Sequence, residues 1–122
     1  MDQRTVLTIE DNEYNRKIVR KLLGTSYRLL EAVDGEAGVA LAVAELPDLI
    51  LMDVQLPKMS GLEATRILRA DVRTKHIPIV IITSFALSGD RERAAETGAA
   101  GYLAKPYSPA QLLAVVRKFL PE

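Results

Sequence analysis

The chain has 122 residues, of which 48% are hydrophobic, and this is enough for one domain with a single packed core. Sixteen basic and sixteen acidic residues cancel, so no excess of positive charge is available to hold nucleic acid or an anionic membrane surface. Cysteine is absent, which excludes disulfides and thiolate metal sites, and no apolar run approaches the roughly 20 residues of a membrane-spanning helix. We therefore expect one cytoplasmic domain over residues 1–122, without a membrane partner.

Five short apolar segments have the length and composition of β-strands. Their expected ranges, in chain order, are Thr5–Ile9, Tyr27–Glu31, Asp48–Met52, Pro78–Ile82 and Ala100–Leu103. Three of them contain nearly continuous aliphatic runs, VLTI, LILM and IVII. Such runs are typical of central parallel strands that are buried on both faces, whereas a half-exposed strand would alternate apolar and polar residues.

Helical patterns separate and follow these strands. The expected boundaries are an end at Gly24, a helix over Gly35–Glu45 behind the N-cap Asp34, a start at Ser60, a polar helix from near Ser88 to Gly98, and a start at Ser108. The last start is the clearest, because Ser108 is followed by Pro109 and by Gln111 at the capping-box position. Five repeats of strand and helix predict right-handed crossovers, parallel strands and a three-layer α/β sandwich.

Polar residues follow the strands at the edge where folds of this kind bind their ligands. Glu10 and Asp11 follow the first strand, Asp53 the third, Thr83 the fourth and Lys105 the fifth. If the first and third strands are neighbours, three carboxylates meet in one crevice, where like charges raise one another's pKa. A divalent cation would relieve this repulsion, and a set of oxygen ligands favours Mg²⁺.

A carboxylate beside Mg²⁺ and an ammonium group is well placed to attack a phosphoryl donor. In this hypothesis Asp53 accepts the phosphoryl group, Lys105 neutralises its charge, and Thr83 hydrogen-bonds a phosphoryl oxygen and draws its loop inward. Each residue alone has an ordinary explanation: Glu10 and Asp11 could cap the first helix, Thr83 could be strand-end polarity, and Lys105 could be a solvated loop charge. The hypothesis therefore depends on their combination.

Four segments together resemble the receiver domain of two-component response regulators. They are VLTIEDNEYN (6–15), PDLILMDVQLPKMSGLEATR (47–66), IPIVIITSFAL (77–87) and GYLAKPYS (101–108). The resemblance extends over essentially the whole chain and implies the flavodoxin-like (βα)5 receiver fold, an α/β fold with a parallel five-stranded sheet in the order 2-1-3-4-5. It further implies a single receiver domain with no output domain, similar to stand-alone cell-division regulators and to receivers of hybrid histidine kinases.

The resemblance also implies a separate role for each of the acidic residues. Asp53 would be phosphorylated, and Mg²⁺ would bind the carboxylates of Asp11 and Asp53 and the backbone carbonyl of Gln55. Glu10 stands where many receivers carry aspartate, and it would act through a metal-bound water. Gln55 and Phe85 occupy positions that tune dephosphorylation in this family.

Residues of the fourth and fifth strands receive roles in the same way. Thr83 would be the switch hydroxyl, and Lys105 would pair with the phosphoryl group. A cis peptide bond would join Lys105 to Pro106. Tyr102 stands at the position of an aromatic residue that rotates when receivers switch.

The implied function is a phosphorylation-dependent signalling switch. Its phosphoryl donor would be a sensor histidine kinase or a histidine phosphotransfer protein, and its output would be protein–protein contact or onward phosphotransfer by a monomer or weak homodimer. No external substrate would be turned over. One alternative is a pseudo-receiver that binds partners without phosphorylation, although the complete set of acids, hydroxyl and lysine disfavours it. A cofactor-binding or phosphatase enzyme on the same fold is less favoured, because a cofactor-binding loop would need small residues in place of Glu10 and Asp11, and an aspartate-based phosphatase would need an acid in place of Gln55.

Overall fold

Strands and helices alternate along the part of the chain that the computed structural model describes, residues 3–84 and 90–121. The strands are β1 (Thr5–Ile9), β2 (Arg28–Ala32), β3 (Leu49–Asp53), β4 (Ile79–Thr83) and β5 (Gly101–Ala104). The helices are α1 (Glu13–Leu23), α2 (Gly35–Glu45), α3 (Gly61–Ala70), α4 (Asp90–Glu96) and α5 (Pro109–Phe119). The predicted helix start near Ser88, and Phe85, lie outside the described residues. None of the helices within the described ranges is long and apolar enough to cross a membrane.

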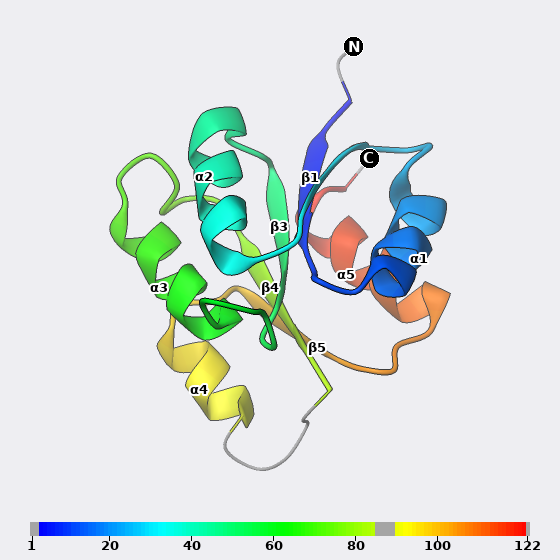
Figure 1. The fold of residues 1–122 in the computed structure, drawn as a ribbon. Helices are drawn as coiled ribbons and strands as arrows, with labels where there is room; N and C mark the ends of the chain where they lie inside the picture. The colour runs from blue at the N-terminus through cyan, green and yellow to red at the C-terminus, as the bar shows by residue number, and fades with distance from the viewer. Residues whose placement is uncertain (1–2, 85–89, 122) are drawn as a thin grey trace.

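The five strands form one parallel sheet in the order β2-β1-β3-β4-β5, which confirms the expected topology. Helices α1 and α5 cover one face of this sheet, and α2, α3 and α4 cover the other (Figure 1). The result is the predicted three-layer α/β sandwich. Because β1 lies between β2 and β3, the strand order reverses there, and folds of this class open a crevice at the carboxyl ends of the strands at such a point.

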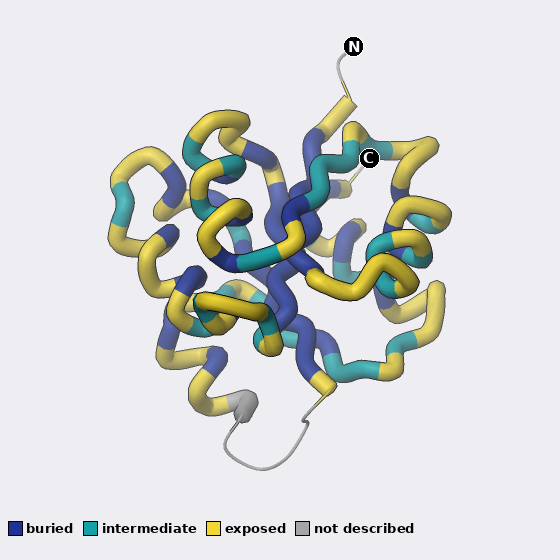
Figure 2. The backbone as a smooth tube through the Cα atoms, viewed as in Figure 1, coloured by how far each residue is buried: buried dark blue, intermediate teal, exposed yellow. Residues whose placement is uncertain are grey.

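Two hydrophobic clusters fill the space between the sheet and its helices. Successive strand residues point to opposite faces. Leu7 and Met52 therefore belong to the cluster under α2, α3 and α4, whereas Val6 and Leu51 belong to the cluster under α1 and α5. The sheet is the buried centre of the molecule, and most of the surrounding loops are exposed (Figure 2). The continuous aliphatic runs thus predicted burial on both faces correctly.

Four strands, β2 to β5, begin and end one residue later than predicted. The predicted ranges of β3, β4 and β5 stop at an apolar residue, but backbone pairing continues through the polar or small residue that follows. Asp53 lies opposite Ile82 in the β3–β4 ladder, and Thr83 lies opposite Ala104 in the β4–β5 ladder. Asp53 and Thr83 are therefore the last residues of strands, and the sheet fixes their backbones more firmly than a loop would.

The predicted helix starts are confirmed at Ser60 and Ser108, where each hydroxyl accepts the backbone N–H three residues later. The first helix differs from one of the interpretations considered above. Its N-cap is Asn12, whose side-chain oxygen accepts a backbone N–H at 3.0 Å, so the interpretation that Glu10 and Asp11 cap this helix is wrong. An asparagine oxygen is a good acceptor for an N-cap, and both acids are left at the end of the first strand.

Candidate functional site

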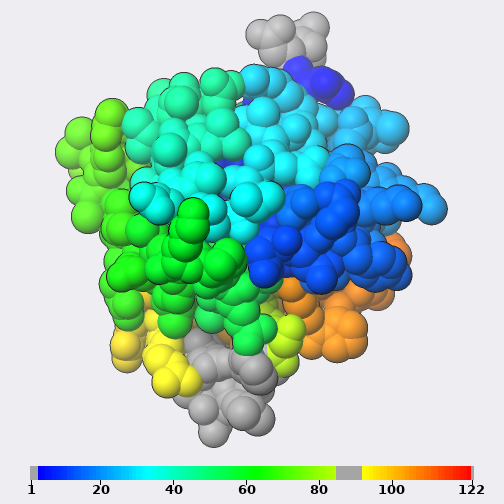
Figure 3. Space-filling model, in the orientation of Figure 1, coloured from blue at the N-terminus to red at the C-terminus, as the bar shows by residue number. Residues whose placement is uncertain are grey.

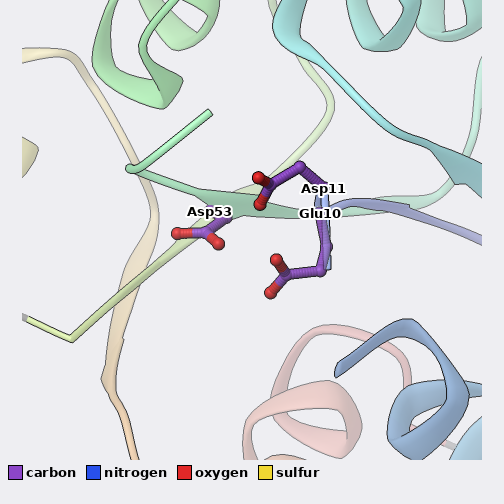
Figure 4. A group of neighbouring side chains, drawn as sticks. All are labelled: Glu10, Asp11 and Asp53. Atoms are coloured by element: carbon purple, nitrogen blue, oxygen red, sulfur yellow. The ribbon is translucent and has the colours of Figure 1, made fainter. Parts of the chain in front are cut away.

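Three carboxylates meet at the carboxyl ends of β1 and β3, and we call Glu10, Asp11 and Asp53 the acidic cluster. One carboxylate oxygen of each residue lies within 4.8 Å of those of the other two. The three carboxylates face a common space (Figure 4). Glu10 and Asp53 are buried, with 6% and 5% of their surface exposed, whereas Asp11 is exposed. The acidic cluster thus has two buried members and one member open to solvent.

The register of the sheet explains why these residues meet. Ile9 lies opposite Met52 in the β1–β3 ladder, so the residues that follow them, Glu10 and Asp53, come side by side at the carboxyl ends of the two strands. Apolar residues on both strands are packed between the helical layers and leave no freedom to shift the register by one residue. The hydrophobic core therefore determines where the carboxylates lie.

A single ammonium group bridges the two buried carboxylates. Lys105 Nζ donates to Glu10 Oε1 at 2.7 Å and to Asp53 Oδ2 at 3.0 Å. Burial by itself lowers the pKa of the Lys105 ammonium, but the hydrogen bond to Glu10 and the charge of Asp53 more than offset this, so its pKa lies above the ordinary value for lysine. Lys105 therefore remains charged at neutral pH and compensates part of the negative charge of the cluster.

Backbone N–H groups occupy the remaining oxygens of the buried carboxylates. The N–H of Gln55 donates to Asp53 Oδ1 at 3.0 Å, and the N–H of Asn12 donates to Glu10 Oε2 at 3.1 Å. Hydrogen bonds of this kind satisfy acceptors that burial removes from water. They also orient both side chains, so the two buried members of the acidic cluster are held by neighbouring backbone as well as by Lys105.

The segment after β3 folds back tightly onto Asp53. The N–H of Gly61 donates to the carbonyl of Val54 at 2.9 Å, which brings the start of α3 against the end of the strand. A Cβ atom on Gly61 would lie only 2.0 Å from the backbone oxygen of Asp53. A glycine is therefore required at this position for steric reasons, because the backbone of α3 approaches the backbone of Asp53 too closely for any side chain.

The other predicted residues lie at different distances from the acidic cluster. Thr83 is 1% exposed at the end of β4, and its carbonyl accepts the N–H of Lys105 at 2.7 Å. The peptide bond between Lys105 and Pro106 is cis. Tyr102 lies two residues deeper in the sheet, opposite Ile81, where it is half-buried against the core. The structure therefore brings Thr83 and Lys105 to the edge that carries the cluster, whereas Tyr102 is set back from it.

A hollow of about 530 Å³ lies beside Lys105, between α1 and the segment that follows β5. Its lining residues are Tyr14, Asn15, Ile18, Ser84, Lys105, Pro106 and Tyr107. On the face shown in Figure 3, the start of α1 (blue), the segment after β3 (green) and the segment after β5 (orange) come together. Burial raises the pKa of the Tyr107 phenol, so this ring remains neutral. The site therefore has an open, largely uncharged approach on the α1 side.

The chain belongs to the response regulator receiver domain family, because residues 6–117 match the model of this family. Receiver domains carry signals in two-component systems through an aspartyl phosphate, and their phosphoryl donors are histidine kinases. The chain is therefore a phospho-aspartate signalling domain with an acidic site, and it is not an enzyme that turns over an external substrate.

Known proteins resemble the chain over nearly its whole length. The polar-differentiation response regulator DivK of Brucella anthropi is 40% identical over 118 residues, which cover 96% of each chain. The receiver domain of the sensor histidine kinase PA1611 of Pseudomonas aeruginosa PAO1, solved with a magnesium ion coordinated in its active site cleft, is 35% identical with a TM-score of 0.90 and full coverage of both chains. The Vibrio cholerae chemotaxis protein CheY4 is 29% identical with a TM-score of 0.90, and the match covers 96% of this chain and 98% of that one.

Proposed function

We propose that Asp53 accepts a phosphoryl group from a phosphohistidine donor in the presence of Mg²⁺, and that the domain switches its binding surface in response. The observation that carries this proposal is the buried Asp53 carboxylate, which lies beside Glu10 and Asp11 and is hydrogen-bonded to Lys105. A receiver that only binds partners would gain little from such a group, because buried charges stabilise a fold no better than well-packed apolar residues.

The acidic cluster fits Mg²⁺ by the chemistry of its donors, which are all oxygens. Asp11 and Asp53 would bind the ion through their carboxylates and Gln55 through its backbone carbonyl, and Glu10 would act through a bound water. When bound, the ion would neutralise charge on the carboxylates and on the transferring phosphoryl group. The related receiver domain of PA1611, with magnesium coordinated in its active site cleft, supports this assignment.

The residues of the chain then have distinct roles in the transfer. An oxygen of Asp53 forms the new O–P bond while the N–P bond of phosphohistidine breaks, and the electron pair of that bond passes to the imidazole nitrogen. Lys105 pairs with the transferred phosphoryl oxygens. Thr83 donates its hydroxyl hydrogen to one of these oxygens, and Tyr102 changes its orientation in response. The surface around β4 and β5 would therefore differ between the two forms.

The proposed partners follow from this chemistry. A sensor histidine kinase or a histidine phosphotransfer protein would deliver the phosphoryl group, and the domain would work in the cytoplasm, where the ATP that charges histidine kinases is found. Residues 1–122 would act as one receiver unit, as a monomer or weak homodimer. The signal would leave through protein–protein contact or onward phosphotransfer, without contact to nucleic acid.

Incubation with acetyl phosphate tests the proposed function directly. We expect the wild-type chain to gain one labile phosphoryl group in the presence of Mg²⁺ and none in the presence of EDTA, as measured by intact-protein mass spectrometry. No gain in Mg²⁺, or an equal gain in EDTA, would refute the proposal.

Replacement of Asp11 with asparagine tests the metal assignment. It removes the exposed carboxylate of the acidic cluster but keeps its shape, so the affinity for Mg²⁺ should fall by about tenfold or more, because ligand charge sets the affinity of such sites. Isothermal titration calorimetry measures this change. Glu45→Gln is the matched control, since it removes one acidic charge at the far end of α2. Equal affinities of the wild type and Asp11→Asn would exclude Asp11 as a ligand.

A further inference from the structure

Arg16 of α1 contacts the loop that carries the acidic cluster, although it is not part of the cluster. Its Nη1 donates to the backbone carbonyl of Glu10 at 2.9 Å. The same guanidinium reaches Glu13 with Nη2 at 2.5 Å and Glu31 with Nε at 3.4 Å. The Arg16 side chain is only 12% exposed. It therefore connects three elements: the end of β1, the first turn of α1 and strand β2.

With the contact from Arg16, the backbone N–H, the backbone carbonyl and the carboxylate of Glu10 all have hydrogen-bond partners. The N–H of Glu10 donates to the carbonyl of Ala32 at 3.0 Å, and its carboxylate accepts from Lys105 and from the N–H of Asn12. Arg16 donates to the carbonyl oxygen of Glu10. This carbonyl belongs to the peptide bond that joins Glu10 to Asp11. The peptide unit between the two acids is therefore held from α1, and the exposed Asp11 follows it directly in the chain.

We propose that Arg16 is a positioning residue for the metal site, which holds the Glu10–Asp11 peptide so that the Asp11 carboxylate is preorganised for Mg²⁺. This inference rests on the proposed function of the site. In other metalloproteins, removal of a residue that orients a metal ligand without binding the metal typically weakens metal binding by about 10- to 100-fold.

A purely electrostatic role for Arg16 predicts the opposite sign. A guanidinium close to the acidic cluster repels a cation, so its removal by itself would strengthen Mg²⁺ binding. A positioning role predicts that its removal weakens binding. The direction of the change in affinity therefore separates the two roles.

Arg20 provides a closely matched control. It lies one turn further along α1, and its guanidinium binds the same two glutamates, Glu13 at 2.9 Å and Glu31 at 2.8 Å. Its side chain is 43% exposed, and the hydrogen bonds of its guanidinium go to these two carboxylates and not to Glu10. Arg16→Met and Arg20→Met thus remove the same charge and similar ion pairs, and they differ in the bond to the carbonyl of Glu10.

The test is isothermal titration of Mg²⁺ into the two variants, with thermal unfolding to establish that each is folded. Relative to the wild type, we expect Arg16→Met to bind Mg²⁺ about 10-fold more weakly. We expect the affinity of Arg20→Met to change by no more than about twofold, because the charge of this exposed side chain is screened by solvent and salt. Phosphorylation by acetyl phosphate should be slow in Arg16→Met at low Mg²⁺ and should return to about the wild-type rate at saturating Mg²⁺. A loss of the chemical step itself would persist at saturation.

Equal or tighter Mg²⁺ binding in Arg16→Met relative to Arg20→Met would overturn the inference. If Arg16→Met does not fold, Arg16→Lys replaces it, because one ammonium group cannot reach the carbonyl of Glu10 and both glutamates together. Wild-type affinity in that variant would also overturn the inference. Failure of the proposed function has a different signature, since the wild-type chain itself would then bind no Mg²⁺ or gain no phosphoryl group.

Discussion

Replacement of Asp53 with asparagine should abolish the gain of a phosphoryl group while the chain remains folded. The asparagine oxygen can still accept the N–H of Gln55, and Lys105 keeps its 2.7 Å bond to Glu10, so the buried charges that remain are one ammonium and one carboxylate. We therefore expect a change in stability of no more than about 2 kcal/mol, the range for one altered buried hydrogen bond. The amide, however, is not a nucleophile toward phosphorus, so intact-mass analysis should show no phosphorylated form.

Asp48→Asn is the control for this variant, because Asp48 precedes the same strand at its opposite end. Its carboxylate accepts the N–H of Thr5 at 2.8 Å, a bond that an asparagine oxygen can also accept. We expect Asp48→Asn to be phosphorylated like the wild type. Phosphorylation of Asp53→Asn to the wild-type extent would show that another residue accepts the group.

Gly61→Ala should destabilise the fold and disturb Asp53 at the same time. The new Cβ would lie 2.0 Å from the backbone oxygen of Asp53 and 2.8 Å from its carbonyl carbon, so either α3 or the end of β3 has to move. Overpacking that shifts backbone costs up to about 3 kcal/mol, which corresponds to a fall of roughly 10 °C in Tm for a domain of this size. Calorimetry measures this fall, and the rate of phosphorylation should decrease because the acceptor is displaced.

Gly101→Ala is the control for steric crowding. Its Cβ would meet side chains rather than backbone, with Val80 Cγ2 nearest at 3.3 Å and Phe119 next at 3.4 Å. Side chains can move by a few tenths of an ångström, so we expect a much smaller change in Tm. Equal stability of Gly61→Ala and Gly101→Ala would mean that the approach of α3 to Asp53 is not as close as described.

The alternation of strands and helices could be predicted from the sequence because the strand patterns and the helix-start patterns agreed, whereas the strand order came from the resemblance to receiver domains. Aliphatic runs indicated buried strands, and serines followed by capping residues indicated helix starts, as at Ser60 and Ser108. Strand ends were predicted less well, since hydrophobicity marks the core while backbone pairing decides where a strand stops. Asp53 and Thr83 illustrate this difference, because both are polar residues that the sheet retains as strand.

The residue types of the site were also visible in the sequence, but their contacts were not. The residues that follow the first and third strands were expected to meet if those strands were neighbours, and the sheet order and the acidic cluster with Lys105 confirm this. The contact of Arg16 with the carbonyl of Glu10 was missed, because it depends on the rotation of α1 over the end of β1. From the sequence alone, Arg16 near the start of the helix, three residues after Glu13, is expected to form only a surface ion pair with that glutamate.

Chemical mapping of the phosphoryl group tests the central claim most directly. Borohydride reduces an aspartyl phosphate to homoserine, so peptide mass spectrometry after reduction identifies the residue that carried the group. We expect homoserine at position 53, in the chain treated with acetyl phosphate and Mg²⁺ and not in the chain treated with EDTA. A reduced residue at position 10 or 11 instead, or none at all, would contradict the assignment of Asp53 as the phosphoryl acceptor.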